Sequence, residues 1–152
     1  MPNTGVSPHT EELPIQSDAV HVVAAFIWHQ QHPEKFLISR RPSGKHLENY
    51  WELPGGKREA DETRWQALHR ELEEELGILI SAGEPYMYQL HSYEDRNILL
   101  DVWQVTRFSG RETALEQQEI AWITVDQIEQ YRFPPADLPI LGAIRNSAIT
   151  GN

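Results

Sequence analysis

The sequence predicts an α/β fold in which a mixed β-sheet lies between helices on both of its faces. The first strand candidate, residues 20–28 (VHVVAAFIW), is apolar on both alternating faces except at His21, as expected of a strand covered on both sides. Shorter strand-like segments, separated by polar turns, lie at 36–39, 86–93, 97–105 and 119–125. Helical patterns are interspersed with these strands, which is typical of a layered domain.

A helix is predicted over residues 64–76. Thr63 and Gln66 have the spacing of an N-terminal capping box, and Gly77 supplies a C-terminal stop. At about 100° per residue, one side of this helix forms an apolar stripe that we expect to be buried. The stripe consists of Trp65, Leu68, Leu72 and Leu76.

The remaining predicted elements are a loop at 40–50 and two short helices at 125–131 and 138–146. Residues 1–18 are polar and lack periodicity, which predicts a flexible N-terminal tail, and 148–152 are expected to form a C-terminal tail. No repeat or linker interrupts residues 19–147, so a single domain is predicted there.

Composition narrows the class of function. The formal net charge is −10, from 13 Lys and Arg against 23 Asp and Glu, which argues against a broad basic face for a nucleic-acid polymer. The chain has no cysteine, so disulfides and cysteine-type zinc sites are excluded. Neither a long apolar run nor a signal-peptide pattern is present, and we therefore expect a cytoplasmic protein without a membrane span.

Four glutamates crowd residues 71–75 of the predicted helix. Three of them, Glu71, Glu74 and Glu75, lie in a sector beside the buried stripe. Glu73 and Arg70 are expected to point away from it. On an exposed face, water would screen these charges at little cost. Beside the buried stripe their repulsion grows, and a hard divalent cation would reverse it. Spacing alone leaves both interpretations open, a solvated face and a metal site.

The residues before the helix complete a longer pattern. Residues 56–78 (GKREADETRWQALHRELEEELGI) match it at Gly56, Glu62, Arg70, Glu71, Leu72, Glu74, Glu75, Gly77 and Ile78. This pattern resembles the signature of the Nudix hydrolases. Segments 38–57, 95–105 and 133–141 resemble the MutT branch, so the resemblance extends over residues 20–144. It implies a Nudix-type α/β/α sandwich with a central mixed β-sheet.

The resemblance also implies a metal site and a catalytic role for several acids. Members of the family hold Mg²⁺, with Mn²⁺ as an alternative, through carboxylates that correspond to Glu71, Glu74 and Glu75 and through the backbone carbonyl of Gly56. Glu71 or a nearby acid such as Glu74 activates the attacking water. The number of metal ions and the general base stay open.

Two further features are implied by the resemblance. Arg70 is expected to orient the acids of the pattern, with Glu62 as its partner. An acid from a late loop joins the metal in MutT-like members. Alignment backwards from Trp122 assigns this position to Glu116, and Glu119 is the alternative.

For the substrate, the resemblance implies a nucleoside triphosphate that is cleaved to the monophosphate and pyrophosphate. Arg41, Lys57 and Arg96 lie in matching segments and are candidate phosphate or substrate contacts. The preferred substrate is expected to be 8-oxo-dGTP or a related noncanonical nucleotide. CTP or a modified cytidine triphosphate is the alternative, and a Nudix-fold sensor that binds without cleaving is a third. The protein is expected to be a monomer or homodimer, without a membrane or nucleic-acid partner.

Two residues are candidates for contacting the base. Asp137 stands where Asn is typical of the MutT members that select 8-oxo-guanine, and an ionised Asp can only accept hydrogen bonds. Asp137 could equally cap the helix that begins at Leu138. Tyr93 could stack on the base, or it could simply pack within its strand.

Overall fold

The computed structural model describes residues 19–44 and 48–149. The predicted N-terminal tail at 1–18 and positions 150–152 lie outside the described residues. Along the chain the elements are β1 (Ala19–Ile27), β2 (Phe36–Arg40), β3 (Trp51–Glu52), β4 (Gly55–Lys57), α1 (Arg64–Leu76), β5 (Leu79–Tyr93), β6 (Arg96–Ser109), β7 (Glu119–Ile123), the 3-10 helices η1 (Val125–Gln130) and η2 (Pro135–Asp137), and α2 (Leu138–Ile149).

The strands form two sheets. The larger sheet has the order β4-β1-β6-β5, and it is mixed because β1 runs parallel to β6 while the other two pairings are antiparallel. The smaller sheet, β3-β2-β7, is antiparallel. A single bridge between Trp28 and Phe36 links the end of β1 to the start of β2.

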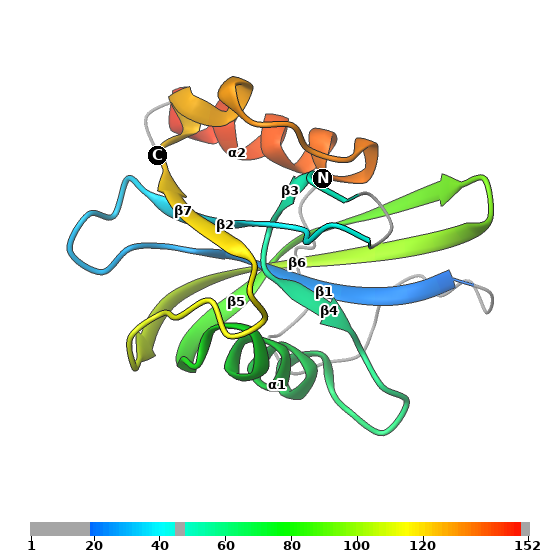
Figure 1. Ribbon diagram of the computed structural model, residues 1–152, viewed down its shortest axis with the longest axis horizontal. Coiled ribbons are helices and arrows are strands. Elements are labelled where there is room, and N and C mark those ends of the chain that lie inside the picture. Colours follow the sequence, from blue (N-terminus) through cyan, green and yellow to red (C-terminus); the bar gives the residue numbers. More distant parts are fainter. Residues whose placement is uncertain (1–18, 45–47, 150–152) are drawn as a thin grey trace.

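Helices cover both sides of the sheet layer, as the sequence predicts (Figure 1). Alternate residues of β1 divide between two apolar cores. Val23, Ala25 and Ile27 pack in the core on the side of α1. Ala24 and Phe26 pack in the core on the side of α2. The apolar run in β1 is therefore explained by burial on both faces.

Helix α1 has the bounds that the sequence predicts. The Thr63 side chain accepts a hydrogen bond from the Gln66 amide, and the Gln66 side chain accepts one from the Thr63 amide, which completes the capping box. Gly77 ends the helix in the left-handed region, with φ of 70°. The predicted stripe is only partly right, because Trp65 is half-buried whereas Arg64 has no solvent exposure.

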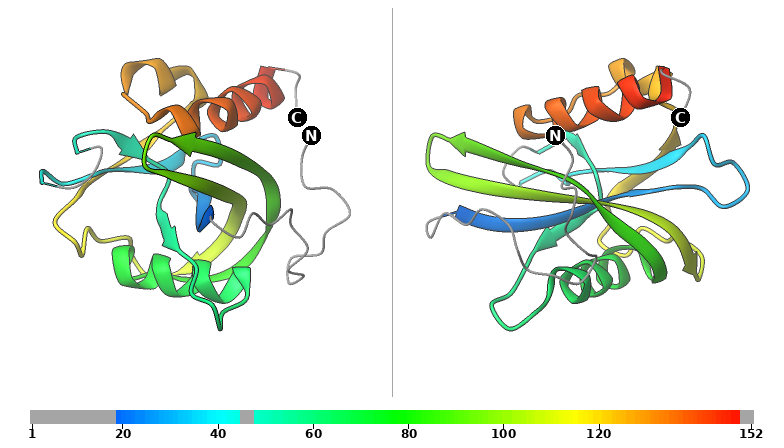
Figure 2. Two further views of the ribbon diagram at one scale, coloured as in Figure 1. Left: turned by 90° about the vertical axis from the view of Figure 1, so that its right-hand side faces the viewer. Right: turned by 180° about the vertical axis from the view of Figure 1, so that it is seen from behind.

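Several boundaries differ from the predictions. Strand β5 begins at Leu79, seven residues before the predicted start, because Gly83 and Pro85 interrupt the apolar pattern while the pairing continues through register shifts. The predicted helix at 125–131 is a 3-10 helix. Helix α2 continues to Ile149, into the segment assigned to the C-terminal tail. The long β5–β6 hairpin curves from the side of α2 to the side of α1 (Figure 2).

Within residues 19–44 and 48–149, no helix is long and apolar enough to cross a bilayer.

Candidate active site

The five predicted substrate contacts lie around one cavity of about 380 Å³, although they come from five different parts of the chain. Arg41 follows β2, Lys57 ends β4, Tyr93 ends β5, Arg96 begins β6 and Asp137 ends η2. The strand pairing of β4, β1, β6 and β5 brings several of these ends together. The cavity is therefore a product of the tertiary fold, and the five residues proposed from the sequence form part of its polar lining.

Positive charge in this cavity is available for an anionic ligand. The Arg96 Nε atom is buried and has no hydrogen-bond partner among the described residues. A buried donor without a partner is costly unless a ligand or water satisfies it. Arg41 also lines the cavity, and its Nη1 atom donates to Glu52 Oε1 at 3.1 Å.

Asp137 lines the cavity and is buried, with 8% of its surface exposed. Burial, together with the nearby Glu52 charge, raises the pKa of Asp137 to about 8, although a hydrogen bond from the Leu53 backbone amide opposes the shift. A protonated carboxyl offers one donor and retains acceptor capacity. The prediction of an acceptor-only Asp is therefore corrected, because the ionised form is disfavoured at neutral pH.

The alternative that Asp137 is the N-cap of the last helix is also wrong. Asp137 ends η2, where its amide donates to the Pro134 carbonyl, and η2 runs directly into α2. An N-cap residue has a non-helical backbone. For Tyr93, the structure shows the packing alternative and leaves stacking on a base as a prediction. Its ring packs against the core beside α2 and also lines the cavity, and its hydroxyl accepts a hydrogen bond from the Ala136 amide at 3.3 Å.

The guanidinium of Arg70 joins three of the acids in the sequence pattern. It donates to Glu62 through Nε at 2.5 Å and Nη2 at 2.9 Å, and these hydrogen bonds lower the pKa of Glu62 to about 2. Its Nη1 atom lies 3.1 Å from Glu71 and 3.4 Å from Glu74. The expectation from helix geometry that Arg70 points away from the acids is therefore wrong, whereas the contacts with Glu62, Glu71 and Glu74 agree with the orienting role that the resemblance implies.

Glu71 stands directly against the strand that precedes the helix. A Cβ atom built on Gly56 would overlap the Glu71 carboxylate, so only glycine permits this approach. Burial raises the pKa of Glu71, although hydrogen bonds from Arg70 oppose the shift. Because Gly56 also lines the cavity, the acids of the helix and the cavity adjoin each other.

Glu75 is the most buried acid of the helix, at 7% exposed. Burial, followed by the charges of Glu52, Glu71 and Glu116, raises its pKa to about 10. Glu74, by contrast, has a side chain that is 55% exposed. The sector predicted for the three acids therefore contains one buried, one half-buried and one exposed carboxylate.

The late loop places Glu116 and Glu119 differently. The Glu116 charge raises the pKa of both Glu75 and Glu52, so it faces the buried acids. Glu119 instead forms an ion pair with Arg40 at 2.7 Å, with both side chains largely exposed. Of the two predicted alternatives, Glu116 is the one whose charge reaches the acids of the helix.

The donor set suits a hard divalent cation. Carboxylate oxygens and a backbone carbonyl are the ligands that Mg²⁺ accepts, and a bound cation would favour the charged form of Glu75, which burial and the neighbouring acids disfavour. In the described part of the chain, no three acidic or histidine side chains stand together as a ready-made metal cluster. The residues fit a metal by chemistry, and binding would have to draw the carboxylates together.

Comparison with known proteins supports the family that the sequence pattern indicates. A family model described as a NUDIX domain matches residues 23–143. The chain belongs to the Nudix family, as a MutT-like hydrolase.

Three similar proteins place it within the family. The chain is 40% identical over 124 residues to the CTP pyrophosphohydrolase of Escherichia coli (strain K12), covering 82% of this chain and 90% of that protein. It is 34% identical over 111 residues to the 8-oxo-dGTP diphosphatase of the same strain, covering 73% and 86%. A solved MutT structure, from a study of Aliivibrio salmonicida and Vibrio cholerae, is 33% identical with a TM-score of 0.73, covering 85% and 98%.

Sequence reasoning missed Glu52, which lines the cavity and whose charge acts on Glu75. Glu52 lines the cavity, pairs with Arg41, and contributes to the raised pKa values of both Glu75 and Asp137. The signal was weak, because Glu52 is one acidic residue in a two-residue strand that the sequence does not reveal.

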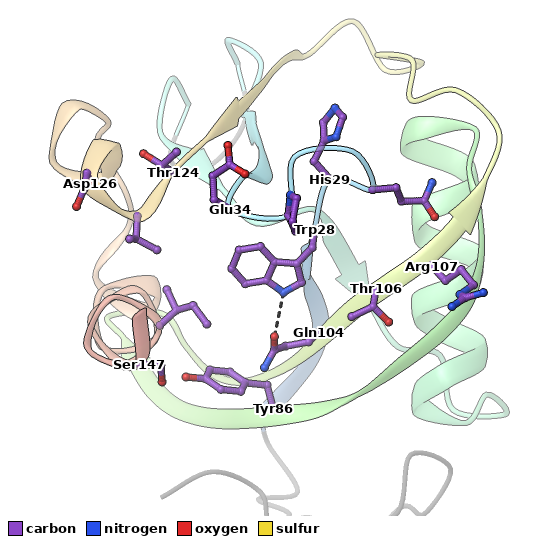
Figure 3. Close-up of a pocket in the computed structure, with 14 residues that line it drawn as sticks. Trp28, His29, Glu34, Tyr86, Gln104, Thr106, Arg107, Thr124, Asp126 and Ser147 are labelled. Carbon is purple, nitrogen blue, oxygen red and sulfur yellow. Dashed lines mark hydrogen bonds between the residues drawn. The ribbon is translucent and has the colours of Figure 1, made fainter. Parts of the chain in front are cut away.

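A second cavity, of about 970 Å³, is larger, and none of the Nudix acids lines it. Figure 3 shows its lining residues. Trp28 and Tyr86 face it, and Gln104 accepts a hydrogen bond from Trp28 Nε1 at 2.9 Å. No predicted site residue lines this cavity. The Nudix site is therefore assigned by its charged groups, since size alone would select the other cavity.

Proposed function

We propose that this protein is a metal-dependent nucleoside triphosphate pyrophosphohydrolase, with 8-oxo-dGTP as the preferred substrate. The observation that carries the proposal is the contiguity of two regions. The cavity holds the buried donor of Arg96 together with Arg41 and Lys57, and it meets the Nudix acids at Gly56. A triphosphate bound by these cations would extend toward the acids.

The proposed reaction is attack of water on the β-phosphorus. The bond between the β-phosphorus and the oxygen that bridges it to the α-phosphorus breaks. That oxygen leaves with the nucleoside monophosphate, and the β- and γ-phosphates are released as pyrophosphate. Glu71, which adjoins Gly56, is proposed to take the proton of the attacking water. Arg70 holds Glu71 and Glu74 in place, and Glu62 in turn holds Arg70.

A divalent metal, Mg²⁺ or Mn²⁺, would be held by Glu71, Glu74, Glu75, Glu116 and the Gly56 carbonyl. When bound, it supplies positive charge for the phosphate oxygens and lowers the pKa of a coordinated water. The proposal is supported by the carboxylate and carbonyl donor set, which matches the preference of hard cations. A monomeric or homodimeric state and a cytoplasmic location are part of the same proposal.

Base selection is proposed to depend on Asp137 and Tyr93. A protonated Asp137 presents a donor and an acceptor in the lining of the cavity, as an Asn amide would. Such a pair suits the edge of 8-oxo-guanine. The second candidate substrate is CTP, and the 40% identity to a CTP pyrophosphohydrolase favours it.

A panel of nucleotides tests the proposal. Pyrophosphate release would be measured for 8-oxo-dGTP, dGTP, CTP and a modified cytidine triphosphate, each with Mg²⁺ and with excess EDTA. We expect metal-dependent release and the highest kcat/KM for 8-oxo-dGTP. A higher kcat/KM for CTP would transfer the assignment to the second candidate. Nucleotide binding without any turnover would identify a sensor instead.

A further inference from the structure

A buried polar network lies under the start of α1, outside the cavity. Arg64 and Asp101 have side chains with no solvent exposure. Arg64 Nε donates to Asp101 Oδ2 at 2.7 Å, and Nη2 donates to Oδ1 at 2.8 Å. Trp103 Nε1 donates to the same carboxylate at 3.1 Å. The Asp101 carboxylate therefore fixes the first residue of the Nudix helix to strand β6.

His21 extends this network from strand β1 in a defined tautomer. Its Nε2 atom lies 2.9 Å from Asp101 Oδ2, and its Nδ1 atom lies 3.1 Å from Arg58 Nε. The guanidinium Nε can only donate, so Nδ1 must be the acceptor and carry no proton. Nε2 then carries the proton and donates to Asp101. His21 thus connects a buried carboxylate to an arginine in the loop after β4.

Arg58 continues the path to the acids of the site. Its Nη1 atom donates to the Glu62 carbonyl at 2.5 Å, and its backbone amide donates to the His21 carbonyl at 2.9 Å. The Glu62 side chain holds Arg70, which contacts Glu71. Each step is a direct hydrogen bond, so the loop at 58–63 is fixed from its sheet side and from its helix side.

We infer that Asp101 and His21 are positioning residues that hold the loop of Glu62 in register with α1, the helix that carries Arg70 and Glu71. This inference rests on the proposed function. Asp101 binds the helix through Arg64, and it binds the loop through His21 and Arg58. The Asp101 carboxylate therefore helps to fix both the helix that carries Glu71 and the loop whose Glu62 holds Arg70. Neither positioning residue lines the cavity, so their effect is expected on turnover more than on substrate binding.

Substitution of His21 separates positioning from general stability, because it leaves the Arg64–Asp101 pair in place. In His21→Ala we expect kcat for pyrophosphate release to fall about 10-fold with KM changed less than about 2-fold. His21→Gln should recover most of the loss, because one amide supplies both an acceptor and a donor. His32→Ala, in the exposed turn between β1 and β2, is the matched control and should match the wild type.

Hydrogen exchange supplies a readout that does not depend on turnover. In His21→Ala, amides of residues 58–63 should exchange faster, while those of β2 and β7 keep wild-type rates. Unchanged kcat together with unchanged exchange at 58–63 would overturn the inference. Faster exchange spread evenly over all strands would also overturn it, because the role would then be purely structural. If the wild type cleaves no nucleotide, the proposed function fails, and exchange at 58–63 still decides the network.

Discussion

A buried carboxylate lies at each end of α1, and the two have opposite electrostatic surroundings. At the first residue of the helix, Asp101 is met by Arg64 and His21, and these partners hold its pKa below the ordinary value although burial alone would raise it. Near the last turn, Glu75 faces other acids, and its pKa is raised to about 10. The first carboxylate stays charged because the chain supplies its counter-charge, whereas the second favours its protonated form unless a cation is bound.

The difference separates an acid that maintains the fold from acids that serve a ligand. A buried ion pair with complete hydrogen bonding neutralises its own charge, and removing one partner is strongly destabilising. Acids that repel each other in a buried setting weaken the fold unless a cation joins them. The contrast therefore makes distinct predictions for substitutions at the two ends.

The largest effect is expected at the compensated end. Asp101→Asn leaves the Arg64 charge buried without its counter-ion, and the free energy of unfolding should fall by about 3 to 5 kcal/mol. Urea denaturation measures this change. The double variant Arg64→Met/Asp101→Leu removes both charges, and its free energy of unfolding should fall much less. A single substitution that proves no worse than the double one would contradict the view that the pair compensates itself.

At the uncompensated end, the main effect should be on activity. Glu71→Gln should lower kcat at least about 100-fold, because it removes both a metal ligand and the proposed base. Glu73→Gln is the matched control, since Glu73 is exposed on the same helix and should leave kcat nearly unchanged. Equal losses in steady-state assays of the two variants would discredit the assignment of Glu71.

Metal binding should make the position of Glu75 among other acids stabilising, whereas in the metal-free protein it is destabilising. Mg²⁺ at about 100 times its dissociation constant stabilises a protein by about 2.7 kcal/mol, which in a domain of this size raises Tm by roughly 5 to 10 °C. Glu75→Gln should raise the Tm of the metal-free protein and reduce the Mg²⁺ response. A calorimetric scan in EDTA and in Mg²⁺ tests both. An unchanged Mg²⁺ response in the variant would remove Glu75 from the ligand set.

The smallest effect concerns Asp137, a third buried acid. Its folded pKa of about 8 lies above the unfolded value near 3.9, so the folded state binds the extra proton between these values. The free energy of unfolding must therefore fall as pH rises from about 4 to 8. Asp137→Asn should remove this slope and stabilise the protein at pH 8 relative to the wild type. Denaturation of both proteins across that range checks the sign.

Local signals explain which parts of the fold were predictable. The capping box and Gly77 fixed the bounds of α1, and the apolar run of β1 predicted burial on both faces. These features depend on residues a few positions apart. The start of β5 escaped detection because Gly83 and Pro85 interrupt the pattern, and only pairing with a distant strand maintains it.

The same distinction applies to the site. The sequence pattern and the family resemblance pointed to Glu71 and Glu75, and to the Arg41, Lys57, Arg96 and Asp137 side chains that line the cavity. They could not reveal that Asp101 pairs with Arg64, 37 positions away, because this contact depends on the packing of α1 against the sheet. They also could not reveal that Asp137 favours its protonated form, because that depends on burial and on the missed Glu52.

The loop that carries Glu116 is attached to the end of α1 by its backbone. The Glu75 carbonyl accepts hydrogen bonds from the Leu115 amide at 3.1 Å and from Gln118 Nε2 at 3.1 Å, and the Leu76 carbonyl accepts one from Thr113. The position of Glu116 is thus set by contacts made after Thr113. The place of this acid beside Glu75 is therefore tied to the C-terminal end of α1 and depends less on the path that the chain takes from β6 to Thr113.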